Sequence, residues 1–213
     1  MRDDILDSGE IVPQPEDGTI SLPTLELEEL GIKDVAWTPV ESGGTNFKTH
    51  KLVEFNDDII KFSGTFGSYI FGFMFFLPGL IILLIGLISL DVFMIGFGML
   101  FGAAGLVMLD SFSIPIVFNR REGLYWKTRL PLWRRLFTND KAFSVKIEDI
   151  KAVQLIDEYI SSSDSSYYSY EINLVLDNNK RLNVVDHGNK QAALSDAEYL
   201  ADFLNVPFLN GLD

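Results

Sequence analysis

Few residues of this chain could take part in catalysis or bind a metal. The sequence has no cysteine and two histidines, His50 and His187. Cysteine nucleophiles and thiolate metal sites are therefore excluded, and a histidine metal site is poorly supplied. Asp186 directly precedes His187, but neighbouring strand residues point to opposite faces, so the pair does not predict a catalytic dyad. The sequence predicts a protein that is not an enzyme and uses neither a metal nor another cofactor.

The segment RLPLWRRLF, residues 129–137, interleaves arginines with apolar side chains. Because it follows a strongly apolar part of the chain, it could place Trp133 among lipid headgroups while its arginines meet anionic lipid. This interpretation predicts a membrane-surface contact formed by Arg129, Leu132, Trp133, Arg134 and Arg135. The alternative is a loop whose apolar residues pack on the folded domain and whose arginines only set the membrane topology.

A second candidate is the loop SSSDSSYYS, residues 161–169, which ends with Tyr167, Tyr168 and a serine. Exposed tyrosines on an adaptable serine-rich loop suit contact with a protein, since aromatic side chains are common anchors at interfaces. The sequence therefore offers Tyr167 and Tyr168 as protein-contact residues. The simpler interpretation is the flexible tip of a β-hairpin.

The elements that would hold these segments begin with a long apolar run. Between Ile70 and Leu109 the only charged residue is Asp91. About forty residues would make a helix of about 60 Å, twice the thickness of a hydrocarbon core of about 30 Å. Two spans fit better, and a turn at Asp91 would let its carboxylate cap a second helix that begins at Val92. A buried carboxylate relay is the alternative, although the run offers it no basic or amide partner.

Basic residues frame this predicted hairpin on both sides. No lysine or arginine occurs between Phe62 and Asn119. The basic residues shortly before and after that stretch are Lys48, Lys51, Lys61, Arg120, Arg121, Lys127, Arg129, Arg134 and Arg135. Cytoplasmic loops are enriched in lysine and arginine, so we expect both termini in the cytoplasm and the Asp91 turn outside.

Glycines recur along one face of each predicted span. They are Gly72, Gly79 and Gly86 in the first span, and Gly98, Gly102 and Gly105 in the second. Small residues on one stripe let helix backbones approach closely in lipid, so these positions are predicted to pack helices together. In the simplest arrangement the two stripes face each other. Alternatively, a stripe binds a second protein or another copy of the chain.

After the apolar run the sequence changes to short segments of alternating hydrophobicity, which predict β-strands. The candidate strands are residues 114–119, 123–128, 142–147, 152–160, 170–176 and 181–186. An amphipathic helix follows, capped by Asn189 and stopped by Pro207. The predicted fold class is an α+β membrane protein, in which an antiparallel, strongly bent sheet or partial barrel is closed by a C-terminal helix.

Four parts of the chain follow from these patterns. They are an acidic, largely disordered leader (1–45), a β-hairpin that joins the cytoplasmic sheet (46–66), a transmembrane helical hairpin (67–111) and the β domain with its C-terminal helix (112–213). The leader contains far more acids than bases, and the whole chain has a formal net charge of −13. This sign argues against nucleic acid as a partner, because phosphate backbones bind basic surfaces.

Several stretches resemble known bacterial proteins. The step VKIEDIKAVQL (145–155), with the strand order and the closing helix, is similar to bacterial pleckstrin-homology-like domains. The stretches at 118–127, 161–176 and 183–189 resemble an uncharacterised family of bacterial two-span membrane proteins. The similarity covers residues 47–208 and implies a location in the bacterial cytoplasmic (inner) membrane. It brings no catalytic residue with it.

These observations lead to two hypotheses about function. The first is a non-enzymatic integral membrane protein that acts as a membrane-tethered protein- or lipid-binding module, or as an accessory subunit of a membrane complex. Its expected partners are the lipid bilayer, a protein partner or a second copy of the chain, and anionic lipids. The second is a small oligomeric transport or channel component built from glycine-rich hairpins.

Overall fold

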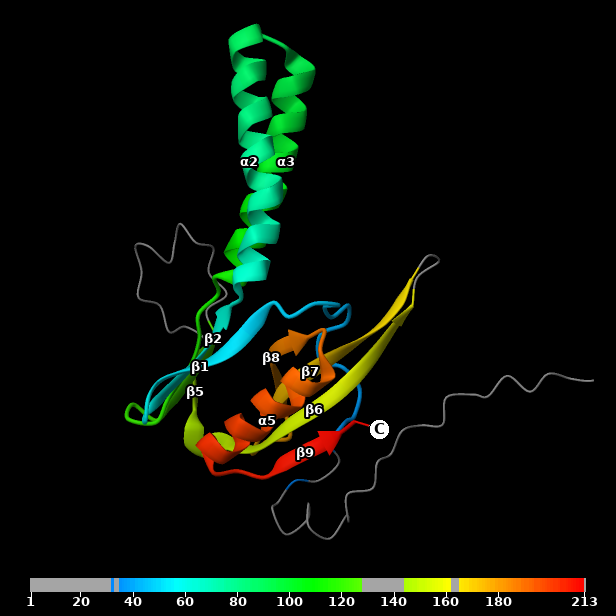
Figure 1. The fold of residues 1–213 in the computed structure, drawn as a ribbon. Coiled ribbons are helices and arrows are strands. Elements are labelled where there is room, and N and C mark those ends of the chain that lie inside the picture. The colour runs from blue at the N-terminus through cyan, green and yellow to red at the C-terminus, as the bar shows by residue number, and fades with distance from the viewer. Residues whose placement is uncertain (1–31, 33–34, 128–143, 162–164, 213) are drawn as a thin grey trace, which may run out of the picture.

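The computed structural model describes residues 32, 35–127, 144–161 and 165–212 (Figure 1). A helical hairpin stands on a domain of two mainly antiparallel sheets and a C-terminal helix, so the α+β class is confirmed. In chain order the elements are β1 (His50–Asn56), β2 (Ile59–Gly64), α2 (Phe66–Ser89), α3 (Val92–Phe112), β3 (Ile116–Asn119), β4 (Leu124–Lys127), β5 (Ser144–Lys146), η1 (Ile147–Asp149), β6 (Ile150–Ser161), β7 (Ser166–Leu176), β8 (Arg181–His187), α5 (Lys190–Leu204) and β9 (Phe208–Gly211).

The apolar run folds into two helices that turn back at Asp91, as the sequence predicted. α2 ends at Ser89, and Leu90 takes a left-handed conformation with φ of 53°. The carboxylate of Asp91 then accepts hydrogen bonds from the backbone N–H groups of Phe93 at 2.9 Å and Met94 at 3.1 Å. These bonds satisfy two of the N–H groups that a helix start leaves without partners. Asp91 is therefore an N-cap, and it is exposed at the end of the hairpin.

The two glycine stripes face each other inside this hairpin. A Cβ atom added to Gly79 would lie 2.2 Å from the backbone N of Gly102, and one added to Gly105 would lie 2.3 Å from the backbone N of Phe76. Such distances are far too short for non-bonded atoms, so the backbones of α2 and α3 touch at these points. Gly102 itself has more room, because its added Cβ would find its nearest neighbour at 3.8 Å.

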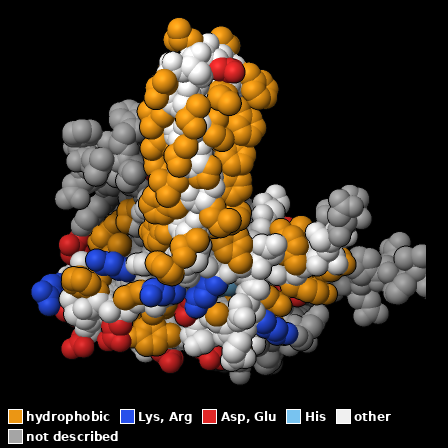
Figure 2. All heavy atoms as spheres, turned by 45° about the horizontal axis from the view of Figure 1, so that its top comes forward, with side chains coloured by type: hydrophobic (Ala, Val, Ile, Leu, Met, Phe, Trp, Pro, Cys, Tyr) orange, Lys and Arg blue, Asp and Glu red, His pale blue; other side chains and the backbone are white. Residues whose placement is uncertain are grey.

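Both helices are long and apolar enough to cross a membrane by length and composition. Their outer faces carry large apolar side chains that are more than half exposed, such as Met74, Leu100 and Val107. Figure 2 shows this apolar surface covering the hairpin along its length. A core helix of a soluble protein would bury its apolar stripe, so the hairpin is not explained by packing within the chain.

The strands form two sheets rather than the single bent sheet or partial barrel that was predicted. One sheet has the order β1-β2-β3-β4-β5 and the other the order β8-β7-β6-β9. The chain passes from the first sheet to the second through the short helical turn η1, between β5 and β6. That turn interrupts strand pairing, and the described strands do not close into a barrel.

The helical hairpin is inserted between two neighbouring strands of the first sheet. β2 pairs antiparallel with β3, so that Ile60 lies opposite Phe118 and Phe62 lies opposite Ile116. α2 begins shortly after Phe62, and α3 ends shortly before Ile116. The hairpin formed by β1 and β2 thus belongs to the sheet that continues after the apolar run.

The main hydrophobic core joins both sheets to α5. It includes Phe62 and Phe118 from the first sheet, Leu155 and Ile172 from the second, and Leu200 from α5. All five are at most 1% exposed. Burial of such side chains contributes about 1.5–3 kcal/mol each, so neither sheet has a complete core without the other.

Two packed segments were not foreseen in the sequence. Beyond Pro207 the chain adds β9, which pairs in parallel with β6 and buries Leu209. Residues 35–45, which belong to the predicted leader, run along the second sheet, where Val35 is 8% exposed. Both segments are short and lack a clear periodic pattern, and the neighbouring strands decide their conformation.

Candidate functional site

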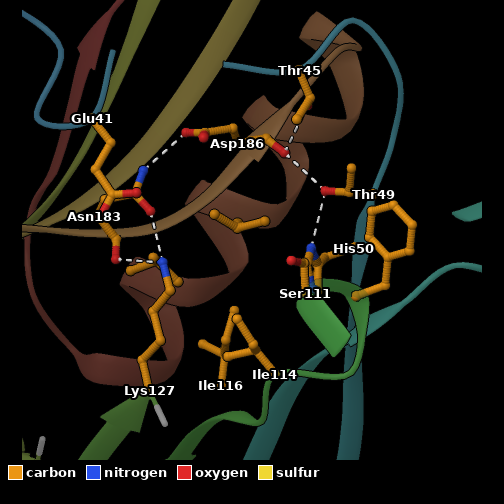
Figure 3. A pocket seen from close by; sticks show the side chains of 13 residues that line it. Glu41, Thr45, Thr49, His50, Ser111, Ile114, Ile116, Lys127, Asn183 and Asp186 are labelled. Atoms are coloured by element: carbon orange, nitrogen blue, oxygen red, sulfur yellow. Dashed lines mark hydrogen bonds between the residues drawn. The ribbon is translucent and has the colours of Figure 1, made fainter. Parts of the chain in front are cut away.

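A cavity of about 250 Å³ lies at the foot of the helical hairpin, where α3 ends (Figure 3). We name it the junction cavity, because the hairpin and both sheets meet there. Its walls are formed by Glu41, Thr45, Thr49, His50, Ser111, Phe112, Ile114, Ile116, Lys127, Asn183, Val184, Val185 and Asp186. Eight of these thirteen residues are polar or charged and five are apolar, so a small ligand could meet both kinds of group there.

Lys127 reaches the junction cavity from the end of β4. The register of the first sheet fixes its position, because Lys127 lies opposite Ile116 of β3. Its ammonium Nζ donates to the side-chain Oδ1 of Asn183 at 2.8 Å and to the backbone oxygen of Asn183 at 3.2 Å. A cation of the first sheet is therefore held by an amide of the second sheet (Figure 3).

Asn183 of β8 uses the other end of its amide to hold two acids. Its Nδ2 donates to Asp186 Oδ1 at 2.9 Å and to Glu171 Oε1 at 3.2 Å. The amide is thus oriented with its oxygen toward the ammonium of Lys127 and its nitrogen toward the carboxylates. This arrangement uses both polar ends of a side chain that is 6% exposed, and buried polar groups require such partners.

Glu171 fastens residues 35–45 to the outer face of the second sheet. Its carboxylate accepts hydrogen bonds from the backbone N–H of Val40, at 3.0 Å to Oε1 and 2.9 Å to Oε2, and from that of Glu41 at 3.3 Å. Burial raises the pKa of Glu171 despite these bonds, which by themselves lower it. The acid therefore holds Glu41, one wall of the junction cavity, in place.

Burial dominates the protonation of the cavity residues. It raises the pKa of Asp186 from 3.8 to about 6, with the nearby acids Glu171 and Glu41 adding to the rise and Asn183 and Lys127 opposing it. Burial also lowers the pKa of His50 from 6.5 to about 4, and the charges of Lys127 and His187 lower it further. Near pH 7 the imidazole of His50 is therefore neutral. The charged form of Asp186 lowers the stability of the folded protein at that pH.

The hydroxyl groups of the junction cavity bind the backbone and His50. Thr45 Oγ1 donates to the backbone oxygen of Asp186 at 3.3 Å, and Thr49 Oγ1 lies 3.4 Å from the same oxygen. Thr49 Oγ1 also lies 3.0 Å from His50 Nδ1. Within the described residues His50 Nε2 has no hydrogen-bond partner, so no third group among them orients the ring as in a catalytic triad. A base with a pKa of about 4 is also poorly matched to proton abstraction at neutral pH.

Metal binding finds no support in the described part of the chain. No group of three or more His, Asp or Glu side chains there could hold a metal ion. What the junction cavity can do is hold a small polar group by hydrogen bonds and charge, with apolar atoms of the same ligand against Phe112 and Ile114.

The sequence-predicted contact residues fall into three groups. The membrane-surface candidates Arg129, Leu132, Trp133, Arg134 and Arg135 lie outside the described residues. Tyr167 donates from its hydroxyl to the backbone oxygen of Gly44 at 3.4 Å, within the chain. Tyr168 is 50% exposed, and its ring lies 5.1 Å from that of Tyr159, centre to centre. The glycines pack the hairpin, as described above, and neither they nor the two tyrosines line the junction cavity.

Asp186 and His187 point to opposite sides of β8, in line with the argument against a dyad. Asp186 lines the junction cavity, whereas His187 is fully buried with its Nε2 3.3 Å from Asp196 Oδ2 of α5. Sequence reasoning missed Lys127, Asn183 and Glu171 as parts of one site. The sole sequence signal was polar residues in otherwise apolar strands, which does not show that they meet.

Neither a model of a known protein family nor a curated protein matches this chain. We therefore infer a function from the geometry of the hairpin and of the junction cavity.

Proposed function

We propose that this chain is a non-enzymatic integral membrane protein, in which a pleckstrin-homology-like domain is held against the cytoplasmic face of the bacterial inner membrane and binds a ligand there. The observation that carries this proposal is the insertion of the hairpin between β2 and β3. The two sheets and the C-terminal helix α5 support the comparison with pleckstrin-homology-like domains.

The insertion supports a topology with both ends of the hairpin on one side of the bilayer. Antiparallel neighbours in a sheet are about 5 Å apart, so the start of α2 and the end of α3 must stay together. A direct bond holds them, because Tyr69 donates from its hydroxyl to the backbone oxygen of Phe112 at 3.3 Å. Ser68 also ties the start of α2 to the domain, since it donates to the backbone oxygen of Thr49, just before β1, at 3.0 Å. A hairpin whose two ends are held together in this way crosses the bilayer with its first helix and returns to the same side with its second.

The distribution of charge supports an orientation with the domain in the cytoplasm. Figure 2 shows Lys and Arg side chains on the domain just below the hairpin, whereas the far end carries the carboxylate of Asp91. Positive charge favours the cytoplasmic side, and anionic lipid on that side attracts it. The junction cavity then lies at the level of the membrane surface, which suits a binding module.

The oligomeric channel receives less support. Its hypothesis uses the glycine stripes as contacts between copies, but Gly79, Gly98 and Gly105 already contact the partner helix of the same hairpin.

Membrane fractionation combined with reporter fusions tests the proposed function. We expect the full chain to remain in the membrane after a carbonate wash. A reporter that is active only in the cytoplasm should work when fused at the C-terminus, and one that is active only outside should work when inserted at Asp91. Opposite compartments for the two ends of the hairpin, or a chain that is soluble without detergent, would contradict the proposal.

A further inference from the structure

The charges of the junction cavity are arranged around one amide. Asn183 accepts a hydrogen bond from the ammonium of Lys127 and donates one to the carboxylate of Asp186. A positive and a negative group therefore lie on opposite ends of the same side chain. A ligand that carries both signs of charge would find a partner for each.

Negative groups outnumber positive ones at this site. Among the described residues that line the junction cavity, the acids are Glu41 and Asp186 and the cation is Lys127. His50 adds no positive charge near neutral pH, because burial keeps its imidazole neutral. A simple phosphate would be repelled by the carboxylates, whereas an ammonium would be attracted to them. The site therefore favours a ligand with a cationic end.

The size and the walls of the cavity limit the ligand further. A volume of about 250 Å³ holds several water molecules but lies just below the range of about 300–1,000 Å³ that is usual for ligand pockets. A phosphoethanolamine group has about eight non-hydrogen atoms, so it is small enough for a cavity of this volume. The apolar side chains Phe112, Ile114, Ile116, Val184 and Val185 form the remaining wall, where a glycerol backbone or the start of an acyl chain would pack.

We propose that the junction cavity binds a primary ammonium group carried by a phosphate ester, and that its source is the headgroup of an aminophospholipid. The ammonium lies against Asp186, with the hydroxyls of Thr45 and Thr49 nearby, and the phosphate lies beside Lys127. The lipid as source rests on the proposed function, because the cavity at the end of α3 then lies at the bilayer surface, where headgroups are found.

Binding of short-chain lipids to the purified full chain tests this inference. The protein in detergent micelles is titrated with dihexanoyl phosphatidylethanolamine, and separately with the choline and glycerol analogues. We expect the ethanolamine lipid to bind about tenfold or more tightly than either analogue, because a charge-assisted hydrogen bond to Asp186 is then gained. The choline group cannot donate hydrogen bonds, and the glycerol lipid has no cation.

Two variants assign the two halves of the ligand. Asp186→Asn keeps the shape and an acceptor for Asn183, and it should weaken the ethanolamine lipid about tenfold. The matched control Asp177→Asn, in the exposed turn after β7, should leave binding unchanged. Lys127→Gln should weaken the ethanolamine lipid but not free ethanolamine, which lacks the phosphate. Thermal unfolding of each variant checks that it is folded.

The outcomes separate this inference from the proposed function. Equal binding of the three lipids, or no effect of Asp186→Asn in a folded variant, overturns the ammonium site even if the protein is fully membrane-inserted. Free phosphoethanolamine that binds as tightly as the lipid overturns the lipid source and supports a soluble ligand of the same chemistry. Preference for the glycerol lipid overturns the proposed polarity of the cavity.

Discussion

At the scale of single residues, the junction cavity contains groups whose burial destabilises the fold, together with groups that bind them by hydrogen bonds. Asp186 and His50 both have pKa values shifted by burial, in directions that favour their neutral forms. Asn183 binds Asp186 and Lys127 together, although neither strand alone requires a polar residue there. Groups that are costly in the empty protein are common where a ligand binds, since stability and function often conflict.

Replacement of Asp186 by Asn should stabilise the ligand-free protein near neutral pH. The folded protein binds a proton at Asp186 more tightly than the unfolded chain, since its pKa rises from 3.8 to about 6. Stability therefore falls as pH rises through that interval, and it stays lower above it. At pH 7 we expect Asp186→Asn to gain about 1–3 kcal/mol, and the gain should vanish near pH 4. Denaturation at both pH values, in one detergent, measures this.

The groups that face Asp186 decide the size of this gain. They are Glu171 of β7, Glu41 before β1, Lys127 of β4 and the amide of Asn183. The control Asp177→Asn should show no such gain at either pH, since this aspartate lies in an exposed turn. A loss of stability at pH 7 in Asp186→Asn would show that the charge is well compensated and would contradict the prediction.

His50 should make the protein sensitive to mild acid. Its imidazole is neutral in the fold down to about pH 4, whereas in the unfolded chain it takes up a proton below about pH 6.5. The stability that this neutral form provides is complete above pH 6.5 and is lost as the pH falls toward 4, by up to about 3 kcal/mol.

His50→Gln should remove this part of the acid sensitivity, because Gln does not titrate and can keep a hydrogen bond to Thr49. Melting temperatures of both proteins between pH 7.5 and pH 4.5 measure the effect. Parallel curves for the two proteins would mean that His50 is not the group responsible.

At the scale of elements, the hairpin depends on backbone contact between its helices. Its large apolar side chains point outward, and its buried positions are mainly glycines. In lipid the hydrophobic effect gives little drive for such a contact, so close packing has to supply it. The positions of the glycines therefore determine where and how closely α2 packs against α3.

Two alanine substitutions on the two sides of the same contact should differ strongly. In Gly79→Ala the new Cβ would meet the backbone of Gly102 at 2.2 Å, so the helices must separate. In Gly102→Ala the nearest atom is at 3.8 Å, which is ordinary contact. We expect Gly79→Ala to cost about 1–3 kcal/mol and Gly102→Ala to be nearly neutral or stabilising. Thermal unfolding in detergent compares them, and equal effects would argue against this packing.

At the scale of the whole molecule, the domain is interrupted by the hairpin rather than attached to it. β1 and β2 precede the helices and the other strands follow them, yet all belong to one core. A division of the chain at residue 112 therefore separates β2 from β3. The part after the hairpin lacks β2, the strand that pairs with Ile116 and Phe118 of β3. The start of α2 is also tied to Thr49, just before β1, through Ser68.

Removal of the hairpin should leave a folded domain, whereas a fragment of residues 112–213 should not fold. In the first variant a short Gly/Ser linker replaces residues 65–113, which is possible because Phe62 and Ile116 are paired. We expect this variant to be soluble, with cooperative unfolding in circular dichroism. The fragment should aggregate or show no cooperative transition. A cooperatively folded fragment would mean that β1 and β2 are dispensable for the core.

The sequence alone determined the features that depend on local composition. Apolar length required two helices, and the single charge at Asp91 placed the turn between them. Glycine spacing predicted the helix contact, and alternation located β3 to β8 to within a few residues, because such patterns report directly which faces are buried. Asn189 was likewise recognised as the cap of α5.

The tertiary structure decided what depends on contacts between distant segments. The division into two sheets, the parallel strand β9 and the path of residues 35–45 arise from pairing with strands far along the chain. The junction cavity also exists only in three dimensions, since Lys127, Asn183 and Asp186 meet through the packing of one sheet against the other. Local periodicity carries no information about such long-range partners, whose choice depends on how the whole core is filled.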